Sequence, residues 1–143
     1  MENRKHIGRE MGIVSNKIRR KIDHEVSKYG LTGVQAKILG FVYCASKDQE
    51  VFQKDIENNF KIRSSSVTSV LQLMEKKGYI KRISVYEDAR LKKIMLTDKG
   101  NEVQEAVFNI LDNIENRIQE EITDEELNFL FSIFDKLSKK LSD

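Results

Sequence analysis

Residues 62–97 read IRSSSVTSVLQLMEKKGYIKRISVYEDARLKKIMLT, and this stretch decides the fold. It opens with a cluster of small hydroxyl residues, continues as an amphipathic helix pattern, and reaches Gly78 directly after two lysines. Lysines followed by a glycine are typical of a helix C-terminus. The two runs that follow, 79–85 and 92–97, alternate apolar and polar residues as strands do. The stretch therefore predicts a helix over 64–77 followed at once by a β-hairpin with a loop at 86–91.

A short helix is predicted over 53–59, just before this stretch, with Ile56 facing inward. It follows a polar loop and a very short strand at 51–52. Two short helices separated by a brief turn form a helix-turn-helix. A further helix over 34–46 opens with Thr32 and Gln35, which fit a capping box. Because this helix is apolar nearly all round, it is expected at the centre of the fold. Cys44 lies on it, and we expect a buried small side chain there rather than a redox-sensing thiol.

The polar face of the 64–77 helix is unusual because it carries hydroxyls and an amide with a single charge. Glu and Lys are the usual residues on a merely solvated face, since Ser and Thr are mediocre helix formers. Small hydroxyls and Gln approach base edges and phosphates closely. Capping is the competing explanation, and one residue of Ser64–Ser66 is expected to cap the helix. The cluster exceeds what capping needs, so the pattern favours DNA contact. The face consists of Ser65, Thr68, Ser69, Gln72 and Lys76.

The hairpin carries its own basic group. Arg90 is predicted near its tip, with Lys92 and Lys93 behind it, which suits phosphates or a narrow minor groove. Asp88 cannot approach a phosphate favourably. We therefore expect Asp88 to orient an arginine, either Arg90 or Arg82.

Long amphipathic helices are predicted at both ends of the chain. One spans 7–29 and stops at Gly30. Another begins after Thr97, and a last one opens with a capping box at 123–126. Their apolar stripes exceed what a compact helix-turn-helix can cover, which favours a symmetric dimer. A self-contained three-helix cap is the alternative.

Composition restricts the possible classes. The chain has 143 residues with 39% hydrophobic and 34% charged residues, no Pro and a single Cys. One cysteine excludes an intramolecular disulfide. No run is apolar enough for a membrane span, and MENRKHIGREMG has no signal-peptide core, so we expect a cytoplasmic protein. Two histidines, without a Cys or carboxylate cluster at ligand spacing, give no metal site. We expect neither an enzyme nor a cofactor.

Net charge is +2, but it is unevenly distributed. Residues 52–97 hold ten Lys/Arg against five Asp/Glu, whereas residues 98–143 hold five against twelve. A positive middle beside an acidic tail indicates that one part of the chain meets a polyanion.

These motifs together resemble the MarR family of bacterial winged-helix regulators. The resemblance covers about residues 8–142, and its components are fairly specific only in combination. They are Leu31-Thr32 with Gln35, the 62–68 cluster, Leu73-Met74-Glu75-Lys76-Lys77-Gly78-Tyr79-Ile80, Asp88-Ala89-Arg90 and Leu96-Thr97-Asp98-Lys99-Gly100.

The resemblance implies a mainly α (α+β) fold. Residues 1–143 would form a single unit, with a winged helix-turn-helix DNA-binding lobe at 32–97 and dimerisation helices at 7–30 and 98–142. It also implies a homodimer on a palindromic operator in double-stranded DNA, commonly a repressor released by a small anionic or phenolic ligand. The implied DNA contacts are Arg63, Ser64, Ser65, Ser66, Thr68, Ser69, Gln72, Arg90 and Lys92, with Asp88 orienting the wing.

Family geometry also implies an effector pocket between the dimer helices and the DNA-binding lobe. Its candidate lining residues are Lys17, Arg20, His24, Phe41 and Tyr43, although each also has an ordinary surface or core role. The competing function is a winged-helix dimer that serves as a protein-protein interaction module and binds no specific DNA. The hydroxyl and Gln face with Arg90 on the wing favours the duplex.

Overall fold

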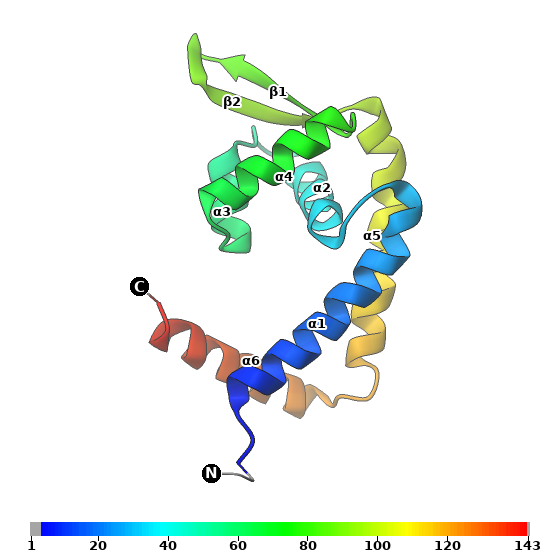
Figure 1. Cartoon of the computed structure of the whole chain (residues 1–143), viewed down its shortest axis with the longest axis vertical. Coiled ribbons are helices and arrows are strands. Elements are labelled where there is room, and N and C mark those ends of the chain that lie inside the picture. The colour runs from blue at the N-terminus through cyan, green and yellow to red at the C-terminus, as the bar shows by residue number, and fades with distance from the viewer. Residues whose placement is uncertain (1–3, 143) are drawn as a thin grey trace. The chain divides into compact units, whose positions relative to one another are not determined.

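The computed structural model describes residues 4–142 of the chain. The chain consists of two compact units, Met1–Ile110 and Leu111–Asp143. The elements, labelled in Figure 1, are α1 (Ile7–Val26), a 3₁₀ turn η1 (Ser27–Tyr29), α2 (Gly33–Ala45), α3 (Gln53–Phe60), α4 (Ser64–Lys76), β1 (Ile80–Val85), β2 (Asp88–Leu96), α5 (Asp98–Gln119) and α6 (Asp124–Lys140). The predicted mainly α fold with one hairpin is confirmed. Among residues 4–142, no helix has both the length and the apolar run needed to cross a membrane.

The core of the first unit is formed by three helices and the hairpin. In Figure 1, α2, α3 and α4 lie together beside β1 and β2. Each contributes side chains that are fully removed from solvent, because their apolar positions recur at helical spacing. Ile56 faces inward from α3, as predicted. The buried side chains of this core include Ile38, Leu39, Ile56, Val67, Leu71, Met74, Ile80 and Ile94.

Local capping chemistry fixes where α2 begins. The Thr32 hydroxyl accepts from the Gln35 N–H at 3.3 Å, and the Gln35 side chain accepts from the Thr32 N–H at 3.0 Å. The predicted capping box is therefore confirmed. Gln35 is 3% exposed, and its Oε1 also accepts from Lys77 Nζ at 3.4 Å. This buried amide thus satisfies its acceptor while it starts the helix.

The prediction that Cys44 is buried is wrong. Cys44 is exposed to solvent. The sequence of α2 is apolar on most sides, but its buried positions, such as Ile38, Leu39 and Val42, occupy one side. Cys44 lies two residues beyond Val42, which places it about 200° further round the helix. It therefore shares the outer face with Lys37, which is also exposed.

The end of α4 is joined to the start of α5. Gly78 follows the helix with φ 87°, a left-handed value that favours glycine. Thr97 Oγ1 donates to the Gly78 carbonyl at 2.5 Å and accepts from the Gly100 N–H at 3.1 Å. Thr97 therefore caps α5, as predicted. A Cβ at position 100 would collide with the Tyr79 carbonyl oxygen, which explains why a glycine is required there.

The first helix ends against this junction. The predicted 7–29 helix is α1 continued by η1, and Gly30 stops it with φ 72°. The Tyr79 hydroxyl donates to the Tyr29 carbonyl, and Lys77 Nζ donates to the Gly30 carbonyl at 2.9 Å. A cation and a hydroxyl on otherwise unsatisfied terminal carbonyls stabilise the helix end.

The hairpin differs from its predicted form. β1 and β2 are antiparallel, and the turn contains only Tyr86 and Glu87, both with left-handed φ of 54° and 57°. The predicted loop at 86–91 is therefore wrong, because β2 starts at Asp88. Ser84 pairs with Lys92 whereas Val85 pairs with Asp88, so the register shifts between Ser84 and Val85.

The hairpin has contacts with the segment before α3. The Tyr86 hydroxyl donates to Glu50 Oε2 at 2.6 Å, which holds the turn despite its unfavourable backbone. The hydrogen bond to Glu50 raises the pKa of the Tyr86 phenol above its ordinary value. On the same side, Phe52 forms a single bridge with Lys93, and the Ile94 N–H donates to the Val51 carbonyl at 2.7 Å. The predicted very short strand is therefore present as one bridge.

The second unit contains the end of α5 and all of α6. Thr123 and Glu126 form the predicted capping box at the start of α6, with the Glu126 N–H 3.1 Å from Thr123 Oγ1. The backbone N–H of Thr123 lowers the pKa of Glu126, because it donates to the carboxylate. Large apolar side chains of α6 and of its C-cap residue are exposed on the isolated chain: Phe129, Leu130, Phe131 and Phe134 in the helix, and Leu141 at its C-cap.

Candidate nucleic-acid interface

The helix-turn-helix consists of α3, a tight turn and α4. Lys61 makes the turn with left-handed φ of 54°, and its N–H donates to the Glu57 carbonyl. Arg63 then occupies the N-cap of α4 in an extended conformation, without a side-chain cap hydrogen bond. The expectation that one of Ser64–Ser66 caps the helix is therefore wrong. These three serines form the first turn of α4 and are exposed.

The hydroxyl groups further along α4 are bonded back to its own backbone. Thr68 Oγ1 donates to the Ser64 carbonyl at 2.9 Å, and Ser69 Oγ donates to the Ser65 carbonyl at 3.2 Å. Thr68 is half-buried, whereas Ser69 and Gln72 are exposed. The opposite side of α4 is packed into the core through Val67, Leu71 and Met74. The predicted polar face is thus on the surface of the lobe.

Gln53 at the start of α3 belongs to the same surface, and no sequence pattern singles it out. Its Nε2 contacts Thr68 Oγ1 at 2.8 Å, the Ser64 carbonyl at 3.3 Å and Ser64 Oγ at 3.4 Å. Phe52 precedes Gln53 at the N-cap of α3. Its N–H donates to the Asp55 carboxylate at 2.9 Å.

The hairpin of β1 and β2 is called the wing. On the wing, Asp88 and Arg90 are in contact. Asp88 Oδ1 lies 2.9 Å from Arg90 N and 3.4 Å from Arg90 Nε, and the Arg90 side chain is 93% exposed. The other candidate partner, Arg82, is paired with Glu75 instead. Its Nη2 and Nε reach Glu75 Oε1 at 2.9 and 3.2 Å, and its N–H donates to Oε2 at 3.0 Å. The Arg82 guanidinium lowers the pKa of Glu75.

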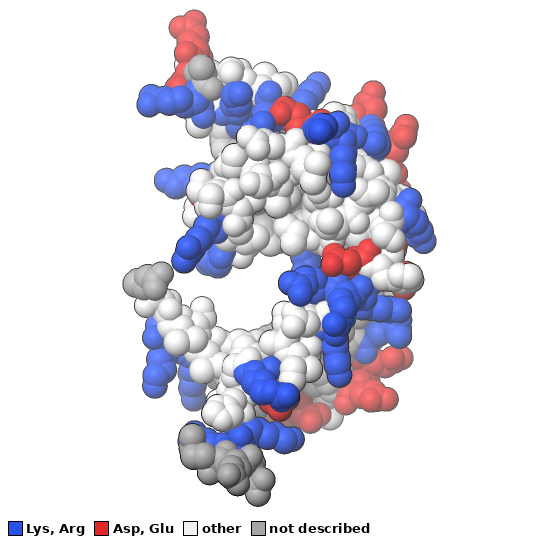
Figure 2. All heavy atoms as spheres, in the orientation of Figure 1, with Lys and Arg blue, Asp and Glu red and all other residues white. Residues whose placement is uncertain are grey.

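A basic groove runs between the start of α3 and the wing. Its volume is about 400 Å³, and four cationic residues line it: Lys54, Arg82, Arg90 and Lys92. Phe52, Gln53, Leu91 and Ile94 complete the wall. Figure 2 shows Lys and Arg side chains along the hairpin, with acidic atoms at its tip. A groove with several cations and one strongly exposed arginine suits a phosphate backbone. Lys54 was not among the predicted contacts.

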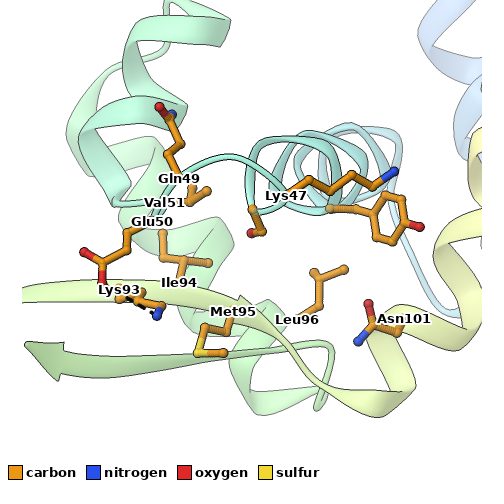
Figure 3. Close-up of a pocket in the computed structure, with 11 residues that line it drawn as sticks. Lys47, Gln49, Glu50, Val51, Lys93, Ile94, Met95, Leu96 and Asn101 are labelled. Atoms are coloured by element: carbon orange, nitrogen blue, oxygen red, sulfur yellow. Dashed lines mark ion pairs between the residues drawn. The ribbon is translucent and has the colours of Figure 1, made fainter.

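A larger open cleft of about 560 Å³ lies between the end of α2, β2 and the start of α5. Figure 3 shows the Lys93–Glu50 ion pair at one end, with Ile94, Leu96 and Asn101 along the wall. The pair distance is 3.8 Å. Opposite, Lys47 Nζ lies 4.5 Å from the centroid of the Tyr43 ring. The cleft therefore combines an apolar floor with charged edges.

The five candidate effector-pocket residues are not brought together in this cleft. Tyr43 lines it, and the other four do not. Lys17, Arg20 and His24 are exposed on α1. Phe41 packs edge-on against Phe60 of α3, with ring centroids 5.8 Å apart. Within residues 4–142, no group of three or more His, Cys, Asp or Glu side chains is placed to hold a metal ion.

A helix-turn-helix with an exposed hydroxyl face, followed by a basic hairpin, defines a DNA-binding winged helix-turn-helix transcriptional regulator. Comparison with known proteins gives the family. Residues 29–91 match the model described as the MarR family. The transcription regulator MarR from Oenococcus oeni PSU-1, known from a crystal structure, is 32% identical in sequence to this chain. The match covers 94% of this chain and 99% of the Oenococcus chain, and the two structures superpose with a TM-score of 0.80. The chain belongs to the MarR family.

Two further relatives extend over most of the chain. The HTH-type transcriptional regulator SarZ of Staphylococcus epidermidis is 27% identical over 136 residues, which is 90% of this chain and 88% of SarZ. MepR of S. aureus, solved in complex with DNA, has a TM-score of 0.88 at 24% identity and covers 97% of this chain and 100% of its own. Because the identity to MepR is only 24%, this similarity shows a shared fold alone.

Proposed function

We propose that this chain regulates transcription as a homodimer that binds a palindromic operator through α4 and the wing. The basic groove carries the proposal, because it places Arg90 and Lys92 of the wing beside the first residues of α3. The exposed hydroxyl and amide face of α4 belongs to the same lobe. In this arrangement the wing and the groove bind backbone phosphates, while α4 meets the base edges of the major groove.

The proposed DNA contacts divide by chemistry. Arg63 at the N-cap of α4, together with Arg90 and Lys92, supplies phosphate contacts that are independent of sequence. Asp88 holds the Arg90 side chain from Oδ1 and restricts its rotamers. The polar residues of α4, which make the base contacts, are Ser64, Ser65, Ser66, Thr68, Ser69 and Gln72. Among proteins of the same fold, MepR and E. coli MarR have been solved with DNA, which supports a duplex as the partner.

Membership of the family supports a proposal for the sign of regulation and for its control. Repression, with release of the DNA by a small anionic or phenolic ligand, is the behaviour that we propose. The effector pocket formed by Lys17, Arg20, His24, Phe41 and Tyr43 stays a prediction. The role of 7–30 and 98–142 as dimerisation helices also stays a prediction.

The proposal is tested by the salt dependence of DNA binding in an Arg90→Ala variant. Anisotropy titrations of a labelled duplex at several salt concentrations give affinity and slope. One lost phosphate contact reduces the slope of log K against log[salt] by about 0.9 and weakens binding to all sequences alike. Arg19→Ala, which removes an exposed arginine from α1, is the control. Retained affinity with an unchanged slope in Arg90→Ala would remove the wing from the interface.

A further inference from the structure

We propose that Thr68 and Ser69 act as hydrogen-bond acceptors toward DNA, and that Gln53 fixes Thr68 in this state. The two hydroxyls then select adenine or cytosine, the bases with an exocyclic amino group, on the strand that they face. This inference rests on the proposed function, since it concerns how α4 reads a base edge. It depends on the internal hydrogen bonds of α4 and α3.

The direction of the Thr68 hydrogen bond is fixed by its partner. Thr68 Oγ1 lies 2.9 Å from the Ser64 carbonyl oxygen, which can only accept. The single hydroxyl proton of Thr68 is therefore used inside α4. A hydroxyl has one donor and two acceptor lone pairs, so what remains on Thr68 is acceptor capacity.

Gln53 removes one of those two lone pairs. The amide end that contacts Thr68 Oγ1 at 2.8 Å also lies 3.3 Å from the Ser64 carbonyl. Only the NH₂ group can face a carbonyl oxygen, since two oxygens would repel each other. Gln53 thus donates to Thr68 and leaves it one lone pair. Rotation of the hydroxyl would break the bond to Ser64 and bring its proton toward the Gln53 amide protons.

The Ser69 hydroxyl, like that of Thr68, donates its proton inside α4. Its Oγ donates to the Ser65 carbonyl at 3.2 Å, which again is an acceptor only. Ser69 is exposed, so its remaining lone pairs are accessible to a ligand. Thr68 and Ser69 therefore present two adjacent acceptors.

An acceptor on the protein distinguishes bases by whether their edge in the major groove carries a hydrogen-bond donor. Adenine N6 and cytosine N4 are donors there, whereas guanine O6 and N7 and thymine O4 are acceptors. A hydroxyl without an available proton is matched to the amino bases and mismatched to guanine and thymine. It is also mismatched to phosphate oxygens, so the two residues contribute to base selection and little to nonspecific affinity.

The test deletes amino groups from DNA one at a time. On the half-site selected from random duplexes, each adenine is replaced by purine and each cytosine by 2-pyrimidinone, and the Kd is measured for wild-type protein and for Thr68→Val and Ser69→Ala. At one or more positions, amino deletion is expected to weaken wild-type binding about three- to tenfold, the value of one hydrogen bond. In Thr68→Val and Ser69→Ala, deleting the amino group of the base that the mutated residue contacts is expected to cause no further loss of affinity. Thr68→Ser keeps the hydroxyl, so it should still lose affinity on that deletion.

Gln53→Met tests the positioning role by the same readout. With the amide removed, only the Ser64 carbonyl still orients the Thr68 hydroxyl and rotation becomes easier, so its amino-deletion penalty shrinks and 7-deazaadenine, which lacks the N7 acceptor, becomes more costly. Gln49→Met, an exposed glutamine in the loop before α3, is the control. The inference is overturned if no amino deletion couples to Thr68 or Ser69, or if 7-deazaadenine couples to them in wild-type protein. Nonspecific binding without any selected half-site overturns base reading, and absence of any binding overturns the proposed function itself.

Discussion

The Arg82 side chain shows how one residue joins the wing to α4. It lies on β1, yet its guanidinium and its backbone N–H both bind Glu75 near the end of α4. The Arg82 side chain is only 20% exposed, whereas Arg90, eight residues further on, is 93% exposed. Arg82 therefore acts mainly within the structure, and Arg90 is the arginine of the wing that is available to a partner.

We predict that Glu75→Gln lowers stability by about 0.5–1 kcal/mol at neutral pH, since the pair is partly solvent-exposed and screened. The pKa of Glu75 is lowered from 4.5, so the carboxylate stabilises the fold fully above pH 4.5, and this contribution is lost as pH falls through the lower pKa of the folded state. Urea unfolding at several pH values measures this. The difference from wild type should shrink in acid, and an unchanged difference would contradict the role of Glu75. Glu102→Gln on α5 is the control.

Among the elements, α4 starts without a side-chain cap hydrogen bond, as do α1 and α3. Thr32 caps α2 and Thr123 caps α6 through side-chain hydrogen bonds, whereas Arg63 at the N-cap of α4 makes none. A better cap such as Ser would stabilise the helix. An arginine at this position gives up the stability of a cap, which supports the phosphate contact that we propose for Arg63.

We predict opposite effects of Arg63→Ser on stability and on binding. The new hydroxyl caps α4 and raises the free energy of unfolding by about 0.5–1 kcal/mol. At the same time, loss of the guanidinium weakens binding to every duplex and lowers the salt slope. Chemical denaturation and anisotropy measure the two quantities separately. Thr32→Ala, which removes a cap from α2, should destabilise the protein. An Arg63→Ser variant that binds DNA as tightly as wild type would exclude Arg63 from the contacts.

Helix ends were predictable because their causes are local. Thr32 with Gln35, and Thr123 with Glu126, act within four residues, so the sequence alone locates them. The hairpin turn was not predictable, because Tyr86 and Glu87 adopt left-handed φ that neither residue favours. The hydrogen bond between Tyr86 and Glu50 accompanies this turn, and its partners are 36 residues apart. The register shift between the two strands likewise cannot be read from local sequence.

The site was predictable in its residue types and less so in its geometry. The hydroxyl cluster and the basic wing were visible as patterns. The contact of Gln53 with Thr68 and the groove position of Lys54 were not, because they depend on the angle at which α3 meets α4. Cys44 was misassigned because an apolar helix sequence does not show which side meets the core.

At the scale of the whole molecule, exposed apolar side chains on the terminal helices favour a second copy of the chain. Ile7, Met11 and Val14 are exposed on α1, and Phe131 and Phe134 are 54% and 41% exposed on α6. Side chains of this kind on amphipathic helices are usually covered in a soluble protein. A symmetric dimer also matches a palindromic site.

We predict that the chain sediments as a dimer, with twice its mass of 16.6 kDa. A double substitution of Phe131→Lys and Phe134→Lys should shift the equilibrium to the monomer at micromolar concentration, because two charges would be buried without partners. Sedimentation equilibrium measures the change. Ile83→Lys, at a comparably exposed position on β1, should leave the mass unchanged. A dimer that persists in the double variant would place the interface elsewhere.

The most direct test of the central claim is selection of bound sequences from random duplex DNA by the purified protein. A homodimer that reads DNA with α4 and the wing should enrich an inverted repeat whose half-sites lie about one helical turn, roughly 10 base pairs, or a multiple of it apart. No enrichment even at low salt would contradict sequence-specific DNA binding and would favour a winged-helix dimer that serves as a protein-protein interaction module.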